Sequence, residues 1–412
     1  MSKEETEEIK ALAQKLIEIV RNEADVSYGQ CQNCVQMIVS ELRVSLNLAE
    51  LNPLENVLLE DVIDIDNCED SEKLQSVLES LSSHVDDHQQ RSWSLYSDED
   101  IICDQLQTLA SLLKLADPRV SIKKLVNNNH KALSKLVEFY QMETRTAIKI
   151  NLLQNFKRIS LLDPKLVELL ISSVLPVELA REITETKNYL SEKFVLSLDV
   201  LGVLFSTGEK IPFTHYDFLN LDFVRFLLDI IENEIENCSE NCMNAAVRLL
   251  IAFNLHFTDV VDNLLLKALA YSQHSLKTFS EQILLLCNKT DKEHVWPYAH
   301  LQSPYVSAMI KLLQDLFSAP DNLADSLFYS NDATVLLDII LREVTDLNPG
   351  KDKTEYLSLL RLIVLNSNIA DSRISEIELT VDHVTREENL PETDGFIINE
   401  IRDAINRKIT LV

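Results

Sequence analysis

The sequence predicts an all-α protein, built as an armadillo- or HEAT-like α-solenoid. Three observations lead to this prediction: apolar residues recur at helical spacing along the chain, the 412 residues include only five glycines, and prolines or turn sequences interrupt the chain at fairly even distances. Hydrophobic residues make up 46% of the chain and aromatic residues only 6%, a balance typical of helices. A chain of this length exceeds what one compact core usually holds, which favours a stack that grows in one direction.

The helical pattern begins with the first residues. Ser2 and Glu5 have the spacing of a capping box, and apolar residues from Ile9 to Val20 follow on one face. The same spacing recurs in the segments 194–205, 247–251, 261–269 and 336–344. We therefore predict one amphipathic helix after another.

Pro176 stands in the apolar run ISSVLPVELAREI, residues 171–183, and predicts a corner between two helices. Its ring removes a backbone donor and clashes with the preceding turn, but it fits the first turn of a new helix. Further interruptions fall at Pro118, Pro164, Pro212, 237–241, Pro297, Pro320 and 348–350. One or two helices are expected between successive interruptions, which suggests the helix–turn–helix units of armadillo and HEAT proteins, of roughly 40 to 47 residues.

The charge distribution divides the chain unevenly. Residues 1–110 carry 24 acidic and 7 basic side chains (−17), and the remaining 42 and 31 (−11) complete the net charge of −28. We predict an acidic N-terminal helical cap over 1–85 and an armadillo-like repeat domain over 86–412. The polar segments 51–70 and 82–100 are expected to connect the two, and 386–396 to form a loop before a final helix.

The same composition excludes several classes of function. An anionic surface repels phosphate backbones and acidic lipids, so neither nucleic acid nor a membrane is an expected partner. The closest glycines, Gly202 and Gly208, are too far apart for a dinucleotide- or phosphate-binding loop. No apolar run approaches the roughly 18 to 20 residues of a membrane span, and no secretory signal is recognisable. With an odd number of cysteines, seven, the chain is expected to be cytoplasmic.

No metal, cofactor or catalytic site is expected. Cys31 and Cys34 have the spacing of half a zinc site or of a redox motif, but a second Cys pair and a βαβ unit are both missing from the pattern. His84 and His88, four residues apart in an acidic segment, are expected to lie on a solvated face. Cys238 and Cys242 are expected in a helical core. We therefore expect a binding protein and not an enzyme.

Two polar features allow alternative interpretations. Asn254 continues the apolar face of 247–251, so its amide is either satisfied inside the fold or placed where it meets a partner. The segment 347–362 concentrates Lys351, Lys353 and Arg361 in an acidic chain. These cations either orient a partner or form an ordinary solvated face.

Eight strings in this sequence are together similar to a known family. They are DDHQQRSWSLY (86–96), ADPRVSIKKL (116–125), SSVLPVELAR (172–181), HY within THYDFL (214–219), FLLDIIE (226–232), LLIAFNLH (249–256), FSEQILLLCN (279–288) and DLNPGKDKTEYLSL (346–359). In order and spacing the chain resembles the C-terminal region of the WISH/DIP family, the NCK-interacting proteins with SH3 domain. The resemblance covers nearly the whole chain and is strongest over about 86–365.

The resemblance implies an armadillo-type solenoid that binds the actin-related protein 2/3 complex. It implies activation of that complex without a preformed mother filament, which yields linear filaments, and association with cortical actin or endocytic sites. Vertebrate members carry an SH3 domain and a proline-rich segment, whereas here only Pro53 precedes Pro118. Recruitment through SH3 ligands is therefore in doubt. The alternative function is a generic armadillo or HEAT scaffold for another helical or extended peptide.

The predicted partner-binding residues lie in the resembling strings at positions that a core does not require. They are Glu178, Arg181, His215, Tyr216, Asn254, Lys351, Lys353 and Arg361. Pro176 is expected to be structural.

Overall fold

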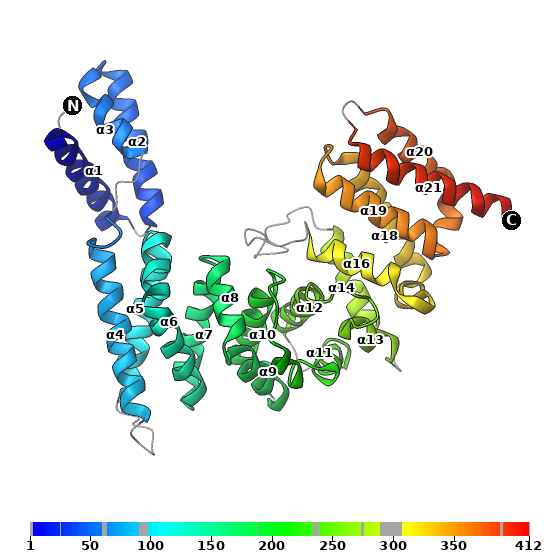
Figure 1. Cartoon of the computed structure of the whole chain (residues 1–412), viewed down its shortest axis with the longest axis horizontal. Helices are drawn as coiled ribbons and strands as arrows, with labels where there is room; N and C mark the ends of the chain where they lie inside the picture. Colours follow the sequence, from blue (N-terminus) through cyan, green and yellow to red (C-terminus); the bar gives the residue numbers. More distant parts are fainter. Residues whose placement is uncertain are drawn as a thin grey trace. The chain divides into compact units, whose positions relative to one another are not determined.

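The computed structural model describes residues 3–24, 26–59, 64–89, 98–186, 188–233, 239–272, 276–288, 307–387 and 390–411. Every regular element among these residues is a helix, as the prediction of an all-α protein requires (Figure 1). The chain divides into two compact units, unit 1 (Met1–Leu166) and unit 2 (Val167–Val412).

Unit 1 holds the first seven α-helices. They are α1 (Lys3–Glu23), α2 (Tyr28–Ser45), α3 (Asn52–Leu59), α4 (Glu69–Gln89), α5 (Glu99–Leu115), α6 (Pro118–Met142) and α7 (Thr146–Ser160), with a 3-10 turn η1 (Ala49–Leu51) before α3. The first three helices pack on one another, and then α4 packs on α6 and α5 on α7. Four non-helical residues, Asn127 to His130, interrupt α6.

Helix α8 (Pro164–Ser172) contains the boundary between the units, and unit 2 continues from it. Its helices are α9 (Leu175–Glu185), α10 (Glu192–Phe205), α11 (Leu221–Asn233), α12 (Glu240–Asn254), α13 (Leu264–Ala270), α14 (Lys277–Asn288), α16 (Ala308–Ser318), α17 (Leu323–Leu327), α18 (Ser330–Asp346), α19 (Lys351–Asn366), α20 (Ile374–Thr385) and α21 (Glu392–Leu411). The 3-10 turns are η3 (Phe213–Asp217), η4 (Pro320–Asn322) and η5 (Ile369–Arg373).

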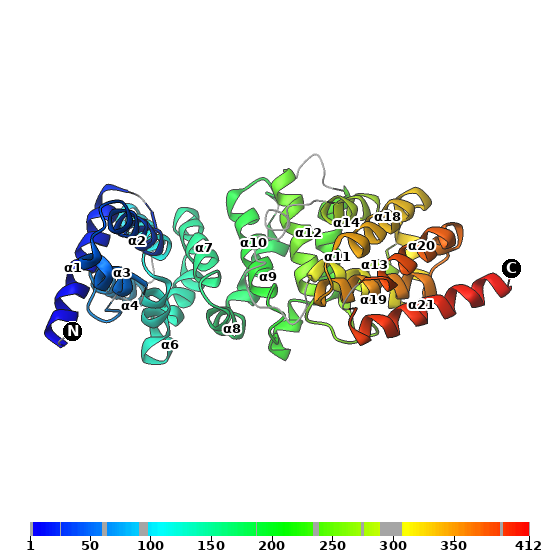
Figure 2. The same cartoon turned by 90° about the horizontal axis from the view of Figure 1, so that it is seen from above.

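The helices of unit 2 form two stacked layers. Layer A is the series α10, α12, α16, α19 and α21, in which each helix packs on the next, and layer B is the series α9, α11, α14, α18 and α20, which packs in the same way. Figure 2 shows the helices from α9 to α21 following one another along this unit. Such repetition, in which each helical pair contacts its neighbours, defines an α-solenoid. The armadillo- or HEAT-like fold class is therefore confirmed.

Local sequence explains several of the helix starts. The chain turns after Ser172 and α9 begins at Leu175, so that Pro176 lies in the first turn as predicted. The Ser191 and Ser239 hydroxyls cap α10 and α12 by accepting from the backbone N–H three residues ahead. These caps satisfy amides that would otherwise lack partners at the start of each helix.

Some expectations about connecting segments are wrong. Residues 52–59 form α3 and α4 extends to Gln89, so large parts of the two presumed connectors are helical. Their apolar residues explain this, because Leu54, Val57 and Val85 are buried. The loop expected over 386–396 is shorter than predicted, because α20 ends at Thr385 and α21 already begins at Glu392. The predicted cap at Ser2 lies outside the described residues.

Across the described ranges, no helix is both long and apolar enough to span a bilayer.

Candidate partner-binding site

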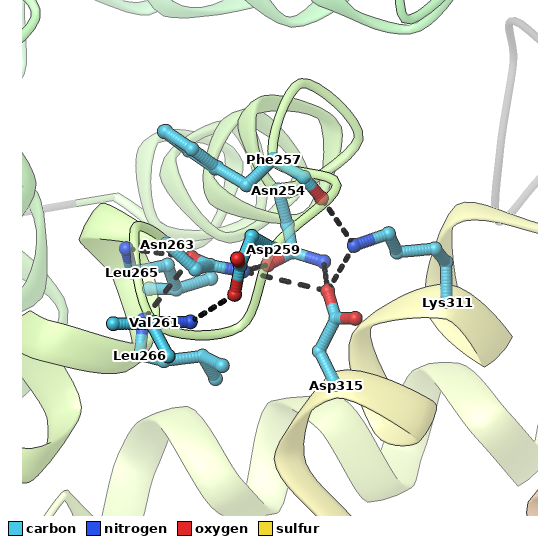
Figure 3. A network of polar contacts seen from close by, with 9 residues as sticks. All are labelled: Asn254, Phe257, Asp259, Val261, Asn263, Leu265, Leu266, Lys311 and Asp315. Carbon is cyan, nitrogen blue, oxygen red and sulfur yellow. Dashed lines mark hydrogen bonds and ion pairs between the residues drawn. The ribbon is translucent and has the colours of Figure 1, made fainter. Parts of the chain in front are cut away.

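Asn254 is the last residue of α12 and the centre of a buried polar network (Figure 3). Its Nδ2 donates to Oδ2 of Asp315 on α16 at 2.7 Å, and its Oδ1 accepts from Nδ2 of Asn263 at 2.7 Å. Asn263 caps α13, because its Oδ1 accepts from the N–H groups of Leu265 and Leu266. Asn254 and Asn263 are both fully buried. Of the two alternatives for Asn254, the structure therefore shows an amide satisfied inside the fold.

Lys311 and Asp315 extend this network on α16. The Lys311 ammonium forms an ion pair with Asp315 and donates to the carbonyl oxygen of Phe257 at 2.6 Å. Lys311 is only 6% exposed, so its charge depends on these acceptors. The network joins α12, α13 and α16 through side chains up to 61 residues apart in sequence.

The electrostatics of Asp315 reflect two opposing effects. Burial raises the pKa of its carboxyl group, while Lys311 and the amide of Asn254 act in the opposite direction by stabilising the carboxylate. The balance leaves the pKa above its ordinary value. The network thus holds a carboxylate at a position where desolvation disfavours it, and removal of either neighbour leaves that charge less compensated.

The three cations of the 347–362 segment occupy different environments at α19. Lys353 is completely buried, where its Nζ donates to the Leu347 carbonyl oxygen at 2.9 Å and pairs with Glu387. Arg361 is partly exposed and pairs with Glu400 of α21 at 2.6 Å. Lys351 is exposed at the start of the helix. Lys353 therefore contributes to the interior and not to a positive surface.

Glu178 and Arg181 lie together on α9. The carboxylate of Glu178, a buried residue, accepts from the guanidinium of Arg181, whose side chain is 48% exposed. Because the acid is buried and the base reaches solvent, Arg181 is the member of this pair that a partner meets first.

The 3-10 turn η3 holds the next two predicted residues. His215 is buried, and burial lowers the pKa of its imidazole. Tyr216 is half-buried, with its ring centroid 6.4 Å from that of Phe257. In the same turn, the Phe213 side chain is 89% exposed, the highest value among the large apolar residues that the structure describes. Exposed aromatic side chains of this kind are frequent anchors in interfaces.

The eight predicted residues lie on four elements of unit 2: α9, η3, α12 and α19. Asn254, Glu178, His215 and Lys353 are buried, whereas Arg181, Tyr216, Lys351 and Arg361 reach solvent. Phe213 was not among the partner-binding residues predicted from the sequence. The feature that could have indicated its exposure is its position directly after Pro212, in a short turn that belongs to neither adjacent helix pattern.

The cysteine and histidine pairs singled out in the sequence are only partly described by the structure. Cys31 is buried, and burial raises the pKa of its thiol, while Cys34, about one turn further along α2, is exposed. No group of three or more potential metal-binding side chains occurs among the described residues. Cys242 is buried in α12, while Cys238 and the side chain of His88 lie outside what the structure describes.

Two solved structures resemble this chain weakly. An engineered protein has 13% sequence identity and a TM-score of 0.35, covering 82% of this chain and 99% of its own. A designed armadillo repeat protein, solved in complex with the peptide (KR)4, has 11% identity and a TM-score of 0.29, covering 81% and 99%. The fold assignment rests on the helix packing within each unit, not on these two likenesses.

A family model matches 140 of the 412 residues, from Ser239 at the cap of α12 to Glu378 in α20. The model is that of the SPIN90/Ldb17 leucine-rich domain. The matched part contains the whole Asn254 network and the start of α19. Residues 239–378 are thus similar to the SPIN90/Ldb17 leucine-rich domain, which supports the resemblance to the WISH/DIP family found in the sequence.

Proposed function

We propose that this chain belongs to the WISH/DIP family of activators and binds the actin-related protein 2/3 complex. In this proposal it promotes nucleation of linear actin filaments without a preformed mother filament. The observation that carries the proposal is the match of residues 239–378 to the SPIN90/Ldb17 leucine-rich domain. The eight resembling strings, several of them outside the matched part, add independent support.

The proposed mechanism needs binding energy and no chemistry on a small molecule. Stacked helices offer an extended surface for a partner helix, with apolar anchors for affinity and charges for orientation. In unit 2, Phe213 and Tyr216 are the proposed anchors, and Arg181, Lys351 and Arg361 are the proposed orienting charges. Activation follows if this surface binds the active arrangement of the complex more tightly than the inactive one.

The buried network has a supporting role in this mechanism. It joins α12, α13 and α16, so the outer side chains of these helices are held at fixed distances. A rigid surface loses less conformational freedom on binding, which favours affinity. The chain acts as a binding protein without a cofactor, at cortical actin or endocytic sites.

Pyrene-actin polymerisation with the purified actin-related protein 2/3 complex tests this proposal. We expect the chain to shorten the lag phase only when the complex is present, in a concentration-dependent manner. The Phe213→Ser variant, which removes a proposed anchor that is 89% exposed, should activate less while retaining wild-type thermal stability. An unchanged lag phase, together with no capture of the complex by immobilised chain, would overturn the proposal in favour of a scaffold for another partner.

A further inference from the structure

The first three helices of unit 1 expose an unusual amount of apolar surface. In the described residues, 22 large apolar side chains are at least 40% exposed. Nine of them lie in the segment from Leu12 to Leu59. This part is about one seventh of the chain, so the enrichment is roughly threefold. Exposed apolar residues scattered singly require no explanation, but a concentration of them indicates an interaction surface.

Helix α2 carries the centre of this surface. Its inner side, with Cys31, Val35 and Val39, is buried where α2 packs on α1 and α3. Met37 is 73% exposed and Val44 is 67% exposed. These two residues are seven apart, so they lie two turns apart on one side of the helix, away from the inner residues. The outward side of α2 therefore carries two exposed apolar side chains, among polar residues such as Asn33 and Glu41.

Further exposed apolar residues lie close by in the sequence. Ile38 follows Met37, turned about 100° from it around the helix, and is 53% exposed; Leu46 and Leu48, in the turn after α2, are 61% and 40% exposed. We call Met37, Ile38, Val44, Leu46 and Leu48 the α2 apolar surface. Its two-turn spacing on the helix matches the anchor spacing with which amphipathic helices dock into apolar surfaces.

The exposed charges of this part of the chain are predominantly negative. Among the side chains that the structure describes from α1 to α3, the exposed charged ones are Lys15 and six glutamates, Glu5, Glu7, Glu8, Glu23, Glu41 and Glu50. Both arginines of these helices are neutralised, Arg21 by Asp70 at 2.6 Å and Arg43 by Glu55 at 2.7 Å. Glu41 lies four residues after Met37 and three before Val44, so it is on the same side of α2 as these two residues. An occupant with positive charge beside its apolar side would therefore be favoured.

We propose that the α2 apolar surface binds an amphipathic helix of a partner protein, with a basic polar face. Leucine-type side chains of that helix cover Met37 and Val44, and its lysines or arginines meet Glu41 and the glutamates of α1. The surface lies in unit 1, outside the matched residues 239–378, so this is a second binding function that does not rest on the actin-related one. A chain with two such sites tethers its second partner to whatever unit 2 binds.

Two other occupants fit the surface less well. An anionic membrane would be repelled by the six exposed glutamates. A second copy of this chain would bring two acidic surfaces together, which also costs electrostatic energy. A basic helix satisfies both the apolar and the charge requirements.

The test uses the full chain of 412 residues and synthetic peptides of about 18 residues, long enough to form helix on binding. One peptide places leucines on one face and lysines on the other, a second replaces every lysine with glutamate, and a third scrambles the first. Fluorescence anisotropy of labelled peptides at physiological salt measures the Kd. We expect the Leu/Lys peptide to bind at least tenfold more tightly than either of the others.

Variants of the chain locate the binding site. Met37→Ser with Val44→Ser should weaken binding of the Leu/Lys peptide at least tenfold. The matched control, Leu285→Ser with Leu379→Ser, removes apolar residues that are 54% and 70% exposed in unit 2 and should leave the Kd unchanged. Circular dichroism and thermal unfolding establish that both variants are folded.

Several results would overturn the proposal. Equal binding of the scrambled peptide, or undiminished binding to the Met37→Ser, Val44→Ser variant, would show only general attraction to an acidic protein. Equal binding of the glutamate peptide would refute the charge argument. A wild-type dimer in sedimentation that dissociates in the same variant would assign the surface to a second copy, and binding of the wild-type chain to phosphatidylcholine vesicles would assign it to a membrane. None of these results affects the nucleation assay.

Discussion

Helices α2 and α12 are of similar length but have opposite surroundings. Ten of the fifteen residues of α12 are buried, including the amide of Asn254, whereas only four of the eighteen residues of α2 are buried. Both helices are rich in apolar residues. The difference lies in their neighbours, because α12 packs on α10, α11, α13, α14 and α16, while α2 packs on α1, α3 and η1.

This comparison shows that a helix can either form part of the interior or keep residues exposed for a partner, depending on how many neighbours cover it. A helix inside the stack is covered on several sides, so even its polar groups must find partners within the fold. A helix covered on one side can keep exposed apolar residues for a partner, at little cost to its own stability.

The largest difference is expected for truncation of one apolar side chain in each helix. Leu250 in α12 is completely buried, so Leu250→Ala should lower the free energy of unfolding by about 3 kcal/mol, through lost burial and a residual cavity. Met37→Ala in α2 should change it by less than about 0.5 kcal/mol. Urea unfolding measures both. Equal losses would mean that α2 is covered in solution and that the contrast is absent.

The pH dependence of stability tests the interior next to α12. Burial lowers the pKa of His256 from its ordinary 6.5 to about 4, and both of its ring nitrogens are buried. The folded state therefore binds fewer protons than the unfolded state between these values. Stability is complete above pH 6.5 and is lost as the pH falls toward 4, by about 3 kcal/mol at most.

Unfolding measured from pH 7.5 to 4.5 checks the predicted contribution of His256. The His256→Gln variant should show a shallower decrease in stability than the wild-type chain. An identical pH profile in the two proteins would mean that His256 can bind a proton without disturbing the fold.

The buried amide offers a smaller but specific comparison. Asn254→Ala removes one donor to Asp315 and one acceptor for Asn263, so the free energy of unfolding should fall by about 2 kcal/mol. The matched control is Asn33→Ala on the exposed side of α2, which should be nearly neutral. If Asn254→Ala left stability intact but weakened binding to the complex, Asn254 would be a contact residue after all.

The smallest effect is expected for the exposed cation of α19. Lys351→Glu should slow association with the actin-related protein 2/3 complex a few-fold and leave thermal unfolding unchanged, because rim charges mainly set the association rate. Stopped-flow or surface-based kinetics at two salt concentrations measure this. The charge-preserving Lys351→Arg variant should associate like the wild-type chain. A rate unaffected by Lys351→Glu would place the start of α19 outside the contact surface.

The sequence predicted the architecture more fully than the site. Helical spacing and the corner at Pro176 depend on neighbouring residues, and the structure confirms the helices and the corner. The helical parts of 51–70 and 82–100 were missed because acidic residues obscured the short apolar patterns of α3 and the end of α4. Polar composition alone does not separate a solvated helix from a connector.

The site depends on pairs that are distant in sequence. Asp315 lies 61 residues after Asn254, and Glu387 lies 34 residues after Lys353. Nothing near Lys353 in the sequence indicates that its ammonium is buried, so it was grouped with Lys351 as a surface charge. The exposure of Phe213 likewise results from the turn that carries it, and not from an apolar pattern.

Single-filament fluorescence microscopy tests the central claim about function most directly. Purified actin, the actin-related protein 2/3 complex and this chain are imaged without preformed filaments. The account predicts new linear filaments whose number increases with the concentration of the chain and requires the complex. Filaments that arise only as branches on existing ones, or an unchanged number of filaments when the chain is added, would contradict it.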